Sequence, residues 1–368
     1  MTSLEHPSAR LDPEVARLLS AFAQEAEMAG DLHPKQLSML YDHKWFKMFI
    51  PKNYGGLGLT LPEAVRLEEA LAWADGSAAW VATLCGGAGW FVGFVDKSIA
   101  DEFFVGDKLC VAGSGSATGT AGITNDGYVI NGLWPYASGS LHATTFTANC
   151  VIHDQGKALL NADGTLRIMP FILKPCEVVV KKTWNATGMV ATASHSFSVS
   201  NVNVPAKRCF EIDPSAATIN DPVYRFPFLP LAGTTLVANV AGMTQRFLDL
   251  AIDSVSEHES SKGMSTCEVV VRKHESTLNN VRRLFFRYLD EAWQQLLVTG
   301  VVPVGNLQEV SLTCHELART CREAVDEIYP LCGMKVLLAE SERNRVWRNI
   351  HMALSHSLFR NRSAAGNS

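Results

Sequence analysis

Residues 123–139 read ITNDGYVINGLWPYASG, and this stretch decides how the middle of the chain folds. Asn125-Asp126-Gly127 is a strong signal for a tight turn between two strands, because these residue types accept the positive φ that such turns need. Apolar residues stand on both sides of the turn, at Ile123, Tyr128 and Ile130. The pattern predicts a β-hairpin.

The β pattern continues after the hairpin to about residue 205. Four later segments are rich in β-branched residues and alternate in polarity, namely TTFTANCVIH, LRIMPFIL, CEVVVKKTW and SHSFSVSNVNVP. Such segments favour strands. The sequence therefore predicts a β region of roughly six to eight strands.

Helical periodicity governs the chain before this region. Residues 1 to about 110 have apolar positions at helical spacing, interrupted by a Gly-rich turn at 51–59. We expect Thr60 to cap the helix LPEAVRLEEALAWA. Residues 77–95 are small and apolar, which predicts a buried helix that a backbone or a ligand can approach closely.

Helical periodicity returns after about residue 225. Long amphipathic segments joined by short loops with glycine predict an antiparallel four-helix bundle. We therefore expect an α+β fold with an N-terminal helical domain (1–110), a central β domain (111–222) and a C-terminal helical bundle (223–368).

The composition excludes several classes of function. The 368 residues include 32 Lys and Arg against 37 Asp and Glu, and no basic block that would bind nucleic acid. No window approaches the roughly 18 unbroken apolar residues of a membrane span, and the N-terminus has no apolar signal core. Nine cysteines occur without a CxxC pair, so we expect no metal site. These features favour a cytoplasmic protein that binds neither nucleic acid nor membrane.

Five strings, in order along the chain, resemble those of the acyl-CoA dehydrogenase superfamily. They are Pro51–Gly58 (PKNYGGLG), Asp75–Trp80 (DGSAAW), Tyr128–Gly139, Trp184–Ser194 and Val202–Pro205. The resemblance spans nearly the whole chain. It implies an N-terminal helical domain, a central β-barrel or sandwich domain and a C-terminal four-helix bundle.

Two further features resemble one branch of that superfamily. Dehydrogenases carry a Glu that removes the substrate α-proton, and Ser357 falls at one of its places, where a serine of ordinary pKa cannot act as the base. Trp347–His356 (WRNIHMALSH) and Tyr136–Gly139 (YASG) instead resemble the flavin-dependent monooxygenase branch. That branch contains the oxygenase components of 4-hydroxyphenylacetate and dibenzothiophene monooxygenases.

The resemblance implies a reduced-flavin-dependent monooxygenase that forms a flavin C4a-hydroperoxide and oxygenates a small organic substrate. It would use reduced FAD or FMN with O₂ and a separate flavin reductase. Ser138 would lie beside the flavin N5. His356 would stabilise the hydroperoxide or move its proton, because the pKa of imidazole lies near the operating pH. His351 is expected to be structural.

The resemblance also implies a set of cofactor-binding residues, namely Gly113, Ser114, Tyr136, Ala137, Ser138, Trp184 and Gly333. Gly113 and Ser114 belong to a loop of small residues over the flavin pyrimidine edge, and Trp184 would pack on the isoalloxazine. Gly333 resembles a bundle turn that meets the pyrophosphate of a neighbouring subunit's cofactor. The resemblance therefore implies a homotetramer, a dimer of dimers.

Some residues depart from the branch and leave alternatives open. Residues 85–90 contain no histidine, although these oxygenases often have one there, near the substrate. Lys262 would be only a weak replacement for the residues that contact the cofactor phosphate in the family. One alternative is an acyl-CoA dehydrogenase-like enzyme oxidising a thioester, for which Glu68 or Glu69 would be the base. Another is a catalytically silent flavin-binding member of the fold, acting as a scaffold or ligand binder.

Overall fold

The hairpin at Asn125-Asp126-Gly127 is present. In the computed structural model, which describes residues 4–256 and 265–359, β1 (Val111–Thr124) pairs antiparallel with β2 (Gly127–Ala137). Thr124 faces Gly127 across the turn. The expected contact at Lys262 lies outside the described residues.

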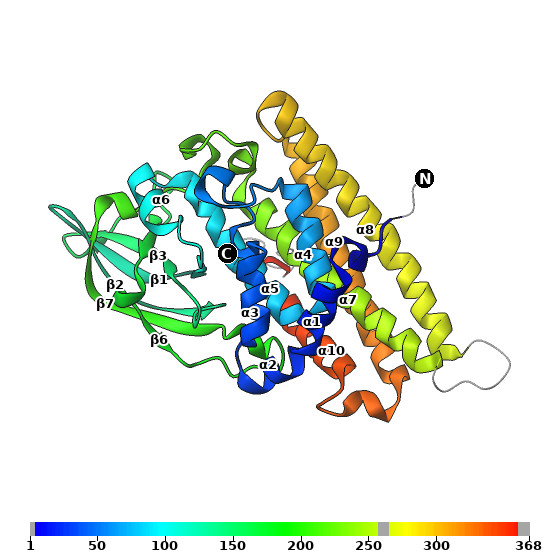
Figure 1. Ribbon diagram of the computed structural model, residues 1–368. Coiled ribbons are helices and arrows are strands. Elements are labelled where there is room, and N and C mark those ends of the chain that lie inside the picture. Colours follow the sequence, from blue (N-terminus) through cyan, green and yellow to red (C-terminus); the bar gives the residue numbers. More distant parts are fainter. Residues whose placement is uncertain (1–3, 257–264, 360–368) are drawn as a thin grey trace.

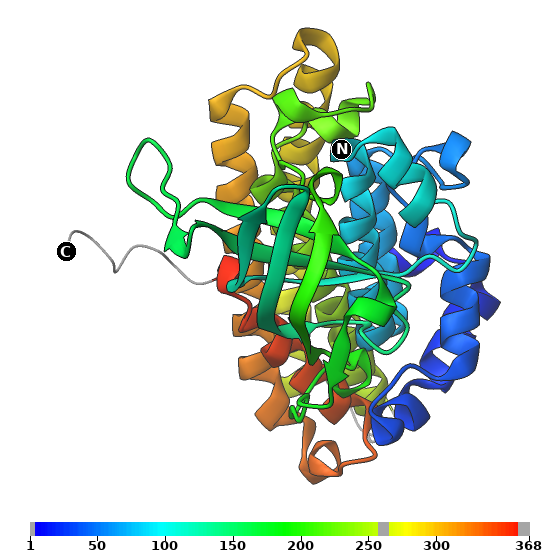
Figure 2. The same ribbon diagram turned by 90° about the vertical axis from the view of Figure 1, so that its left-hand side faces the viewer.

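The β region forms one mixed sheet of seven strands among the described residues, within the range expected from the sequence. The strands run in the order β4-β3-β1-β2-β7-β6, with β5 also paired to β3, and only the β1–β3 pair is parallel. The later strands are β3 (Thr145–Asp154), β4 (Lys157–Ala158), β5 (Ile168–Leu173), β6 (Val179–Lys181) and β7 (His195–Pro205). Figure 2 shows the sheet in front of the helices.

Helices precede and follow the sheet in the chain, as predicted. The N-terminal helices are α1 (Pro13–Ala21), α2 (Ala23–Ala29), α3 (Pro34–Asp42), α4 (Leu61–Ala74), α5 (Gly76–Gly89) and α6 (Lys97–Phe103). The C-terminal bundle consists of α7 (Phe228–Ser256), α8 (Thr266–Thr299), α9 (Val304–Ile328) and the shorter α10 (Glu342–Leu354). Figure 1 shows the sheet on one side and the long bundle helices on the other, with α4 and α5 beside α7.

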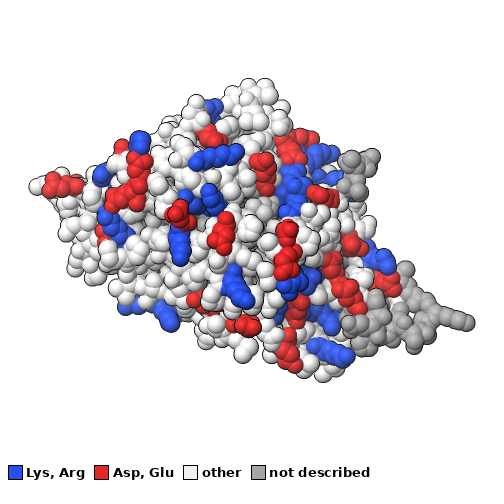
Figure 3. Space-filling view, in the orientation of Figure 1, with Lys and Arg blue, Asp and Glu red and all other residues white. Residues whose placement is uncertain are grey.

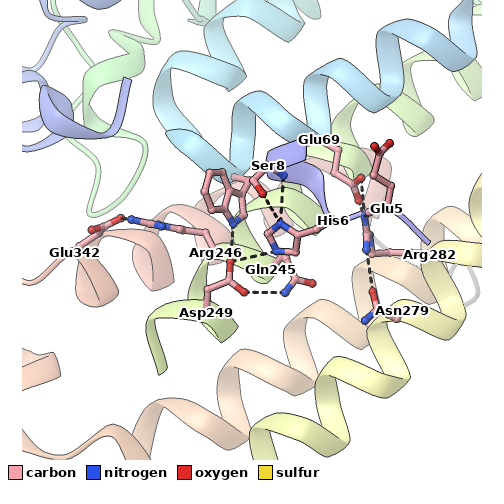
Figure 4. A network of polar contacts seen from close by, with 11 residues as sticks. Glu5, His6, Ser8, Glu69, Gln245, Arg246, Asp249, Asn279, Arg282 and Glu342 are labelled. Atoms are coloured by element: carbon pink, nitrogen blue, oxygen red, sulfur yellow. Dashed lines mark hydrogen bonds and ion pairs between the residues drawn. The ribbon is translucent and has the colours of Figure 1, made fainter. Parts of the chain in front are cut away.

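The two helical parts share one hydrophobic core, while the sheet has a smaller core of its own. Helix α4 packs so closely on α7 that a Cβ added at Gly242 would lie 2.1 Å from the carbonyl oxygen of Glu69. An ion pair joins the same regions, since Arg282 of α8 bonds to Glu69 and Asn279 (Figure 4). The three-domain division at 110 and 222 therefore stays a proposal.

Local signals fix the starts of α4 and α5. Thr60 caps α4 in a reciprocal pair with Glu63, and the Asp75 carboxylate accepts a hydrogen bond of 2.8 Å from the Ala78 backbone at the start of α5.

We expected no membrane-spanning segment, yet Gly76–Phe94 is long and apolar enough to cross a membrane. Because 78% of this stretch is buried within the protein, it is a core helix, as the small apolar residues predict.

Candidate active site

Ser138 lies just past the end of β2, at the junction between the sheet and α5. Its side chain is buried, and its carbonyl oxygen lies 3.5 Å from the Cys85 sulfur, which donates to it. The following Gly139 has a φ of 71°, and a Cβ there would lie 2.8 Å from the same sulfur. The close approach of β2 to α5 therefore depends on a glycine at 139.

Three hydroxyl groups form a chain that begins at Ser138. The Oγ atoms of Ser138 and Ser194 are 2.7 Å apart, and the Ser194 Oγ lies 2.7 Å from the Thr192 Oγ1. Thr192 in turn donates to the carbonyl oxygen of Met189 at 2.7 Å. All three hydroxyl-bearing residues are buried.

The direction of the chain follows from its last bond. A carbonyl oxygen can only accept, so the Thr192 proton points to Met189, and Ser194 must then donate to Thr192. Ser138 must consequently donate to Ser194. The Ser138 hydroxyl is left with lone pairs and no free proton, so it acts as an acceptor toward any further partner.

Unusual backbone conformations gather around this hydroxyl chain. Tyr136, Met189 and Ala193 have φ values of 65°, 53° and 45°, a region that non-glycine residues seldom occupy. Such strain persists only where the surrounding structure imposes it, and it is concentrated at functional sites. The three positions flank Ser138, Thr192 and Ser194 in sequence. This supports the assignment of the region as a binding site.

Trp184 and Tyr136 lie beside the same chain. Their rings are 6.3 Å apart, edge to face, and Tyr136 is 68% exposed. The indole N–H of Trp184 donates to the Met189 carbonyl at 3.0 Å, so this oxygen accepts two bonds. The structure therefore brings together Tyr136, Ala137, Ser138 and Trp184, as expected from the sequence.

Helix α10 fixes the segment that contains Met189. The Asn349 side-chain oxygen accepts a hydrogen bond of 2.6 Å from the Met189 backbone, and Arg348 donates to the carbonyl of Thr187. Gly188 passes so close that a Cβ would lie 2.2 Å from the Arg348 carbonyl oxygen. The bundle thus holds one side of the site in place.

His356 follows α10 and lies against α5. Its ring is half-buried, with its centroid 6.2 Å from that of Trp80, and its Nδ1 accepts a hydrogen bond of 3.3 Å from the Leu358 backbone. The neutral ring therefore carries its proton on Nε2. Trp80 and Cys85 both belong to α5, so His356 and Ser138 contact the same helix a little over one turn apart.

The remaining expected cofactor residues lie at two places. Gly113 and Ser114 are on β1, where Gly113 packs so tightly on β3 that a Cβ would lie 2.1 Å from the Thr147 Oγ1. Gly333 follows α9 with a φ of 72°, and a Cβ added there would meet nothing within 4 Å. Gly333 is thus at an open turn of the bundle.

The other residues considered from sequence have different surroundings. His351 lies 3.1 Å from the Asp326 carboxylate and against the Trp347 ring, and burial lowers the pKa of His351 although Asp326 opposes the shift. Ser357 is exposed. Both Glu69 oxygens bond to Arg282, at 2.7 and 2.9 Å. This carboxylate is therefore committed to an ion pair.

Ser194, Thr192 and Asn349 were not among the site residues chosen from sequence. Ser194 and Thr192 belong to the string Trp184–Ser194 that was recognised, but only the fold shows that they are hydrogen-bonded in series to Ser138. Asn349 belongs to the string Trp347–His356, which resembles the monooxygenase branch. Its contact with a loop 160 positions away in the chain is a tertiary feature.

The two surface cavities lie away from this site, and the surface charges do not mark it. Cavities of about 690 and 580 Å³ lie along α4, α8 and the N-terminal segment, and neither is lined by Ser138 or His356. Among residues 4–256 and 265–359, no three metal-ligating side chains gather. On the face shown in Figure 3, acidic and basic side chains are interspersed.

Comparisons with family models and with known proteins agree on one family. The family model "Acyl-CoA dehydrogenase, N-terminal domain" matches residues 12–93, and "Acyl-CoA dehydrogenase, C-terminal domain" matches residues 234–361. The chain is 26% identical to indole-3-acetate monooxygenase of Pseudomonas putida, over 86% of this chain and 81% of the relative. It is 24% identical to the oxygenase subunit HsaA of a flavin-dependent monooxygenase of Mycobacterium tuberculosis, over 97% and 94%.

Solved structures agree with the fold. The HsaA crystal structure from M. tuberculosis superposes with a TM-score of 0.87 at 19% identity, covering 94% of this chain and 91% of that one. XiaF from a Streptomyces species, solved with FADH2 and glycerol, gives 0.83 at 18% identity, covering 94% and 89%. The two domain matches together span more than half of the sequence, and the chain belongs to the acyl-CoA dehydrogenase family.

Proposed function

We propose that this protein is the oxygenase component of a two-component flavin-dependent monooxygenase. It takes reduced FAD or FMN from a separate flavin reductase and uses O₂ to oxygenate a small organic substrate. The names of its relatives support this reaction class. The observation on which it rests in this chain is the direction of the hydroxyl chain at Ser138.

The direction of that chain fits a reduced flavin. Reduced flavin carries a hydrogen on N5 and is a donor there, whereas N5 of oxidised flavin has only a lone pair. Ser138 offers an acceptor, because its own proton is directed to Ser194. A hydroxyl in this state complements the reduced ring and leaves the oxidised ring without a donor at N5.

His356 supplies the proton chemistry in this proposal. When bound, the reduced flavin supplies the electrons that activate O₂. In the neutral ring, the Nε2–H of His356 would donate a hydrogen bond to oxygen at the flavin, because Nδ1 already accepts from the Leu358 backbone. Trp80 holds the imidazole against α5, which fixes its direction.

The other cofactor contacts are proposed by position. Gly113, Ser114, Tyr136, Ala137 and Trp184 hold the ring. Gly333 meets the pyrophosphate of a neighbouring subunit's cofactor in a homotetramer, a dimer of dimers, and the protein is cytoplasmic. Exposed apolar side chains along the bundle support an assembly of this kind.

The dehydrogenase alternative has less support. It needs an ionised carboxylate at the substrate face of the flavin, but Ser357 stands at one expected place and Glu69 is bound to Arg282. Glu68 is fully buried, and burial raises the pKa of its carboxyl group well above the ordinary value, which favours the neutral acid over a base. A catalytically silent member of the fold would not need the acceptor state of Ser138. Each alternative predicts a reaction of the flavin with O₂ that differs from that of an oxygenase.

Rapid mixing tests the proposal. Protein with anaerobically reduced FMN or FAD is mixed with oxygenated buffer while the flavin spectrum is recorded. We expect a transient spectrum distinct from both the reduced and the oxidised flavin, with a shorter lifetime in His356→Ala. His351→Ala is the matched control. The His351 ring faces Asp326 at 3.1 Å, so this substitution should leave the lifetime unchanged. Direct conversion to oxidised flavin in the wild-type protein would contradict the proposal.

A further inference from the structure

Trp184 is held by one hydrogen bond from its indole ring and one from its backbone. The indole N–H donates to the Met189 carbonyl oxygen at 3.0 Å, and the backbone N–H donates to Nδ1 of His195, also at 3.0 Å. A carbonyl oxygen keeps its lone pairs at every pH, whereas an imidazole nitrogen can take up a proton. Of these two partners, His195 is therefore the one that can change its state.

His195 is the first residue of β7 and follows directly on the hydroxyl chain at Ser194. It pairs across the sheet with Ala137, the residue before Ser138, and it is only 7% exposed. Its backbone N–H bonds to the carbonyl oxygen of Ala193, one of the strained positions. The imidazole ring is thus carried by a fixed part of the sheet, next to the residue proposed to face the flavin.

Side chains take over from the backbone ladder just before Trp184. The pairing of β6 with β7 runs to Lys181 and Ser196. Beyond this pair, the Thr183 hydroxyl accepts a hydrogen bond of 2.9 Å from the Ser196 backbone, and the His195 ring accepts the bond from Trp184. The second of these contacts positions the backbone of Trp184.

The state of the His195 ring follows from its bond. A backbone N–H can only donate, so Nδ1 must present a lone pair, and the ring must be neutral with its proton on Nε2. An imidazolium carries a hydrogen on both nitrogens and would turn an N–H toward the N–H of Trp184. Protonation of His195 therefore replaces a hydrogen bond by the repulsion of two donors.

The surroundings of the ring favour its neutral form. Burial lowers the pKa of His195 below its ordinary value of 6.5, and the positive charge of Lys182 lowers it further. Asp31, in the loop between α2 and α3, opposes this shift, and its carboxylate also lies 2.7 Å from Nε2 of His142. The bond to Trp184 is therefore intact at neutral pH and is lost as the pH falls through the lowered pKa of His195.

We propose that His195 is a positioning residue that holds Trp184 against the flavin ring while the imidazole is neutral, and that it releases Trp184 on binding a proton. This rests on the proposed function for the location of the flavin beside Trp184. The contacts that carry it belong to the chain itself. His195 thereby makes the affinity for flavin depend on pH through a second residue.

The expected effect is that of one hydrogen bond. Without the bond from His195, Trp184 samples orientations in which its ring does not meet the flavin. The apparent affinity then falls in proportion to the fraction of molecules that keep the competent orientation. The loss of one net hydrogen bond allows a change of about tenfold.

Two substitutions at position 195 test the proposal. In His195→Asn the side-chain amide oxygen can take the place of Nδ1 as an acceptor that does not titrate, and in His195→Leu the acceptor is absent. The affinities of these variants and of the wild type for reduced FMN and reduced FAD are measured by anaerobic calorimetry from about pH 5 to about pH 8.

We expect the ratio of the wild-type affinity to that of His195→Asn to fall about tenfold from neutral to acidic pH. Because the ratio is taken at one pH, the titration of the flavin itself and of His356 cancels. His195→Leu should bind about tenfold more weakly than His195→Asn at every pH. Recovery by the amide and the change in pH profile together mark a role as acceptor.

Two controls separate titration from disturbance of the sheet. His153→Asn makes the same substitution at a histidine of β3, paired with Ala158, and should leave the affinity and the pH profile as in the wild type. Thr183→Ala breaks the neighbouring bond to Ser196 without removing a titrating group. Any loss of affinity in Thr183→Ala should therefore be the same at every pH.

Thermal unfolding of the same variants identifies a purely structural role. In that case His195→Leu would lower Tm and leave the flavin affinity as in the wild type, which would overturn the proposal. A pH profile that is the same in the wild type and in His195→Asn would overturn it as well. If His195→Leu does not fold, the comparison of the wild type with His195→Asn still decides.

The two proposals fail separately. A protein whose flavin affinity follows the substitutions at 195 but which gives no flavin transient keeps the role of His195 and loses the oxygenase function. A protein that gives the transient, with equal flavin affinities in the wild type and in His195→Leu, keeps the function and loses the role of His195. Failure of both flavins to bind would overturn both proposals.

Discussion

At the scale of single residues, the site depends on the direction of hydrogen bonds as well as on their presence. Ser138, Ser194 and Thr192 could be ordered in either direction if they stood alone. The Met189 carbonyl fixes the order because it cannot donate. One backbone oxygen thereby decides whether Ser138 faces a flavin as donor or acceptor.

Substituting Ser194 should weaken the preference of the site for reduced over oxidised flavin. In Ser194→Ala the Ser138 proton loses its acceptor and can turn toward the flavin, so N5 of the oxidised ring gains a donor. We expect the ratio of affinities for reduced over oxidised flavin to fall about tenfold, as one hydrogen bond allows. Fluorescence titration under anaerobic and aerobic conditions measures both affinities. Ser140→Ala is the control, since its hydroxyl bonds separately to Ala193, and an unchanged ratio in Ser194→Ala would contradict the argument.

Asp75 gives a prediction for the pH dependence of stability. Burial raises the pKa of Asp75 from 3.8 to about 6 in the folded protein, although the Ala78 backbone and Arg345 oppose the shift. The folded state then binds the proton more tightly than the unfolded state, so this group's contribution to stability falls as pH rises from about 4 to about 6.

Asp75→Asn keeps a helix cap and removes this titration. Relative to the wild type, the variant should gain up to about 3 kcal/mol in free energy of unfolding between pH 4 and pH 7. Urea unfolding at several pH values provides the measurement. Parallel pH profiles for the two proteins would show that Asp75 does not titrate in this range.

At the scale of elements, two close approaches hold the site. Helix α10 clamps the loop at Met189 through Asn349 and Gly188, and α4 lies against α7 at Gly242. The second contact sets the spacing between α4 and α7.

The α4–α7 contact should tolerate no side chain at Gly242. In Gly242→Ala the new Cβ would overlap the Glu69 carbonyl oxygen, 2.1 Å away, and both atoms belong to rigid helices. We expect a loss of at least about 2 kcal/mol in the free energy of unfolding. Gly233→Ala on the same helix is the control, because its nearest atom is the Cys314 sulfur at 4.0 Å.

Gly233→Ala should be neutral or stabilise the protein by up to about 1 kcal/mol through helix propensity. Urea unfolding of the two variants compares them directly. Equal stability of both would mean that α4 and α7 separate easily.

At the scale of the whole molecule, apolar side chains remain exposed on the bundle. They include Val298 and Val301 at the end of α8, Val304 and Leu312 on α9, and Met334 beyond α9. Val298, Val301 and Val304 lie around the turn between α8 and α9, and exposed apolar side chains gathered in this way are typical of an interface between subunits. It supports the proposed homotetramer and the placing of Gly333 against a neighbouring cofactor.

Charges on this face should break the assembly. Val298→Glu with Leu312→Glu places two carboxylates in the proposed interface, and we expect smaller species in sedimentation experiments at concentrations where the wild type is tetrameric. Met28→Glu, at an equally exposed apolar position on α2, should leave the assembly intact. A wild-type monomer, or a double variant that remains tetrameric, would contradict the proposed interface.

Much of the fold could be predicted from sequence because its signals are local. The turn at Asn125-Asp126-Gly127, the Thr60 cap and the apolar helix after Asp75 each act within a few residues. The residues Tyr136–Ser138 and Trp184 were also predicted to share a site, through a resemblance of short strings. Their neighbours could not be chosen in the same way, because Ser194 and Asn349 are ordinary polar residues until the fold brings them to Ser138 and Met189.

The sequence by itself determined the order of helices and strands, the small-residue helix against the sheet, and the family. Those depend on periodicity, turns and caps, which are properties of neighbouring residues. Only the tertiary structure decided the direction of the Ser138 hydroxyl and the burial of Glu68 beside its paired neighbour Glu69. The physical reason is that hydrogen-bond direction and desolvation depend on all atoms within a few ångströms, and most of those atoms come from distant parts of the chain.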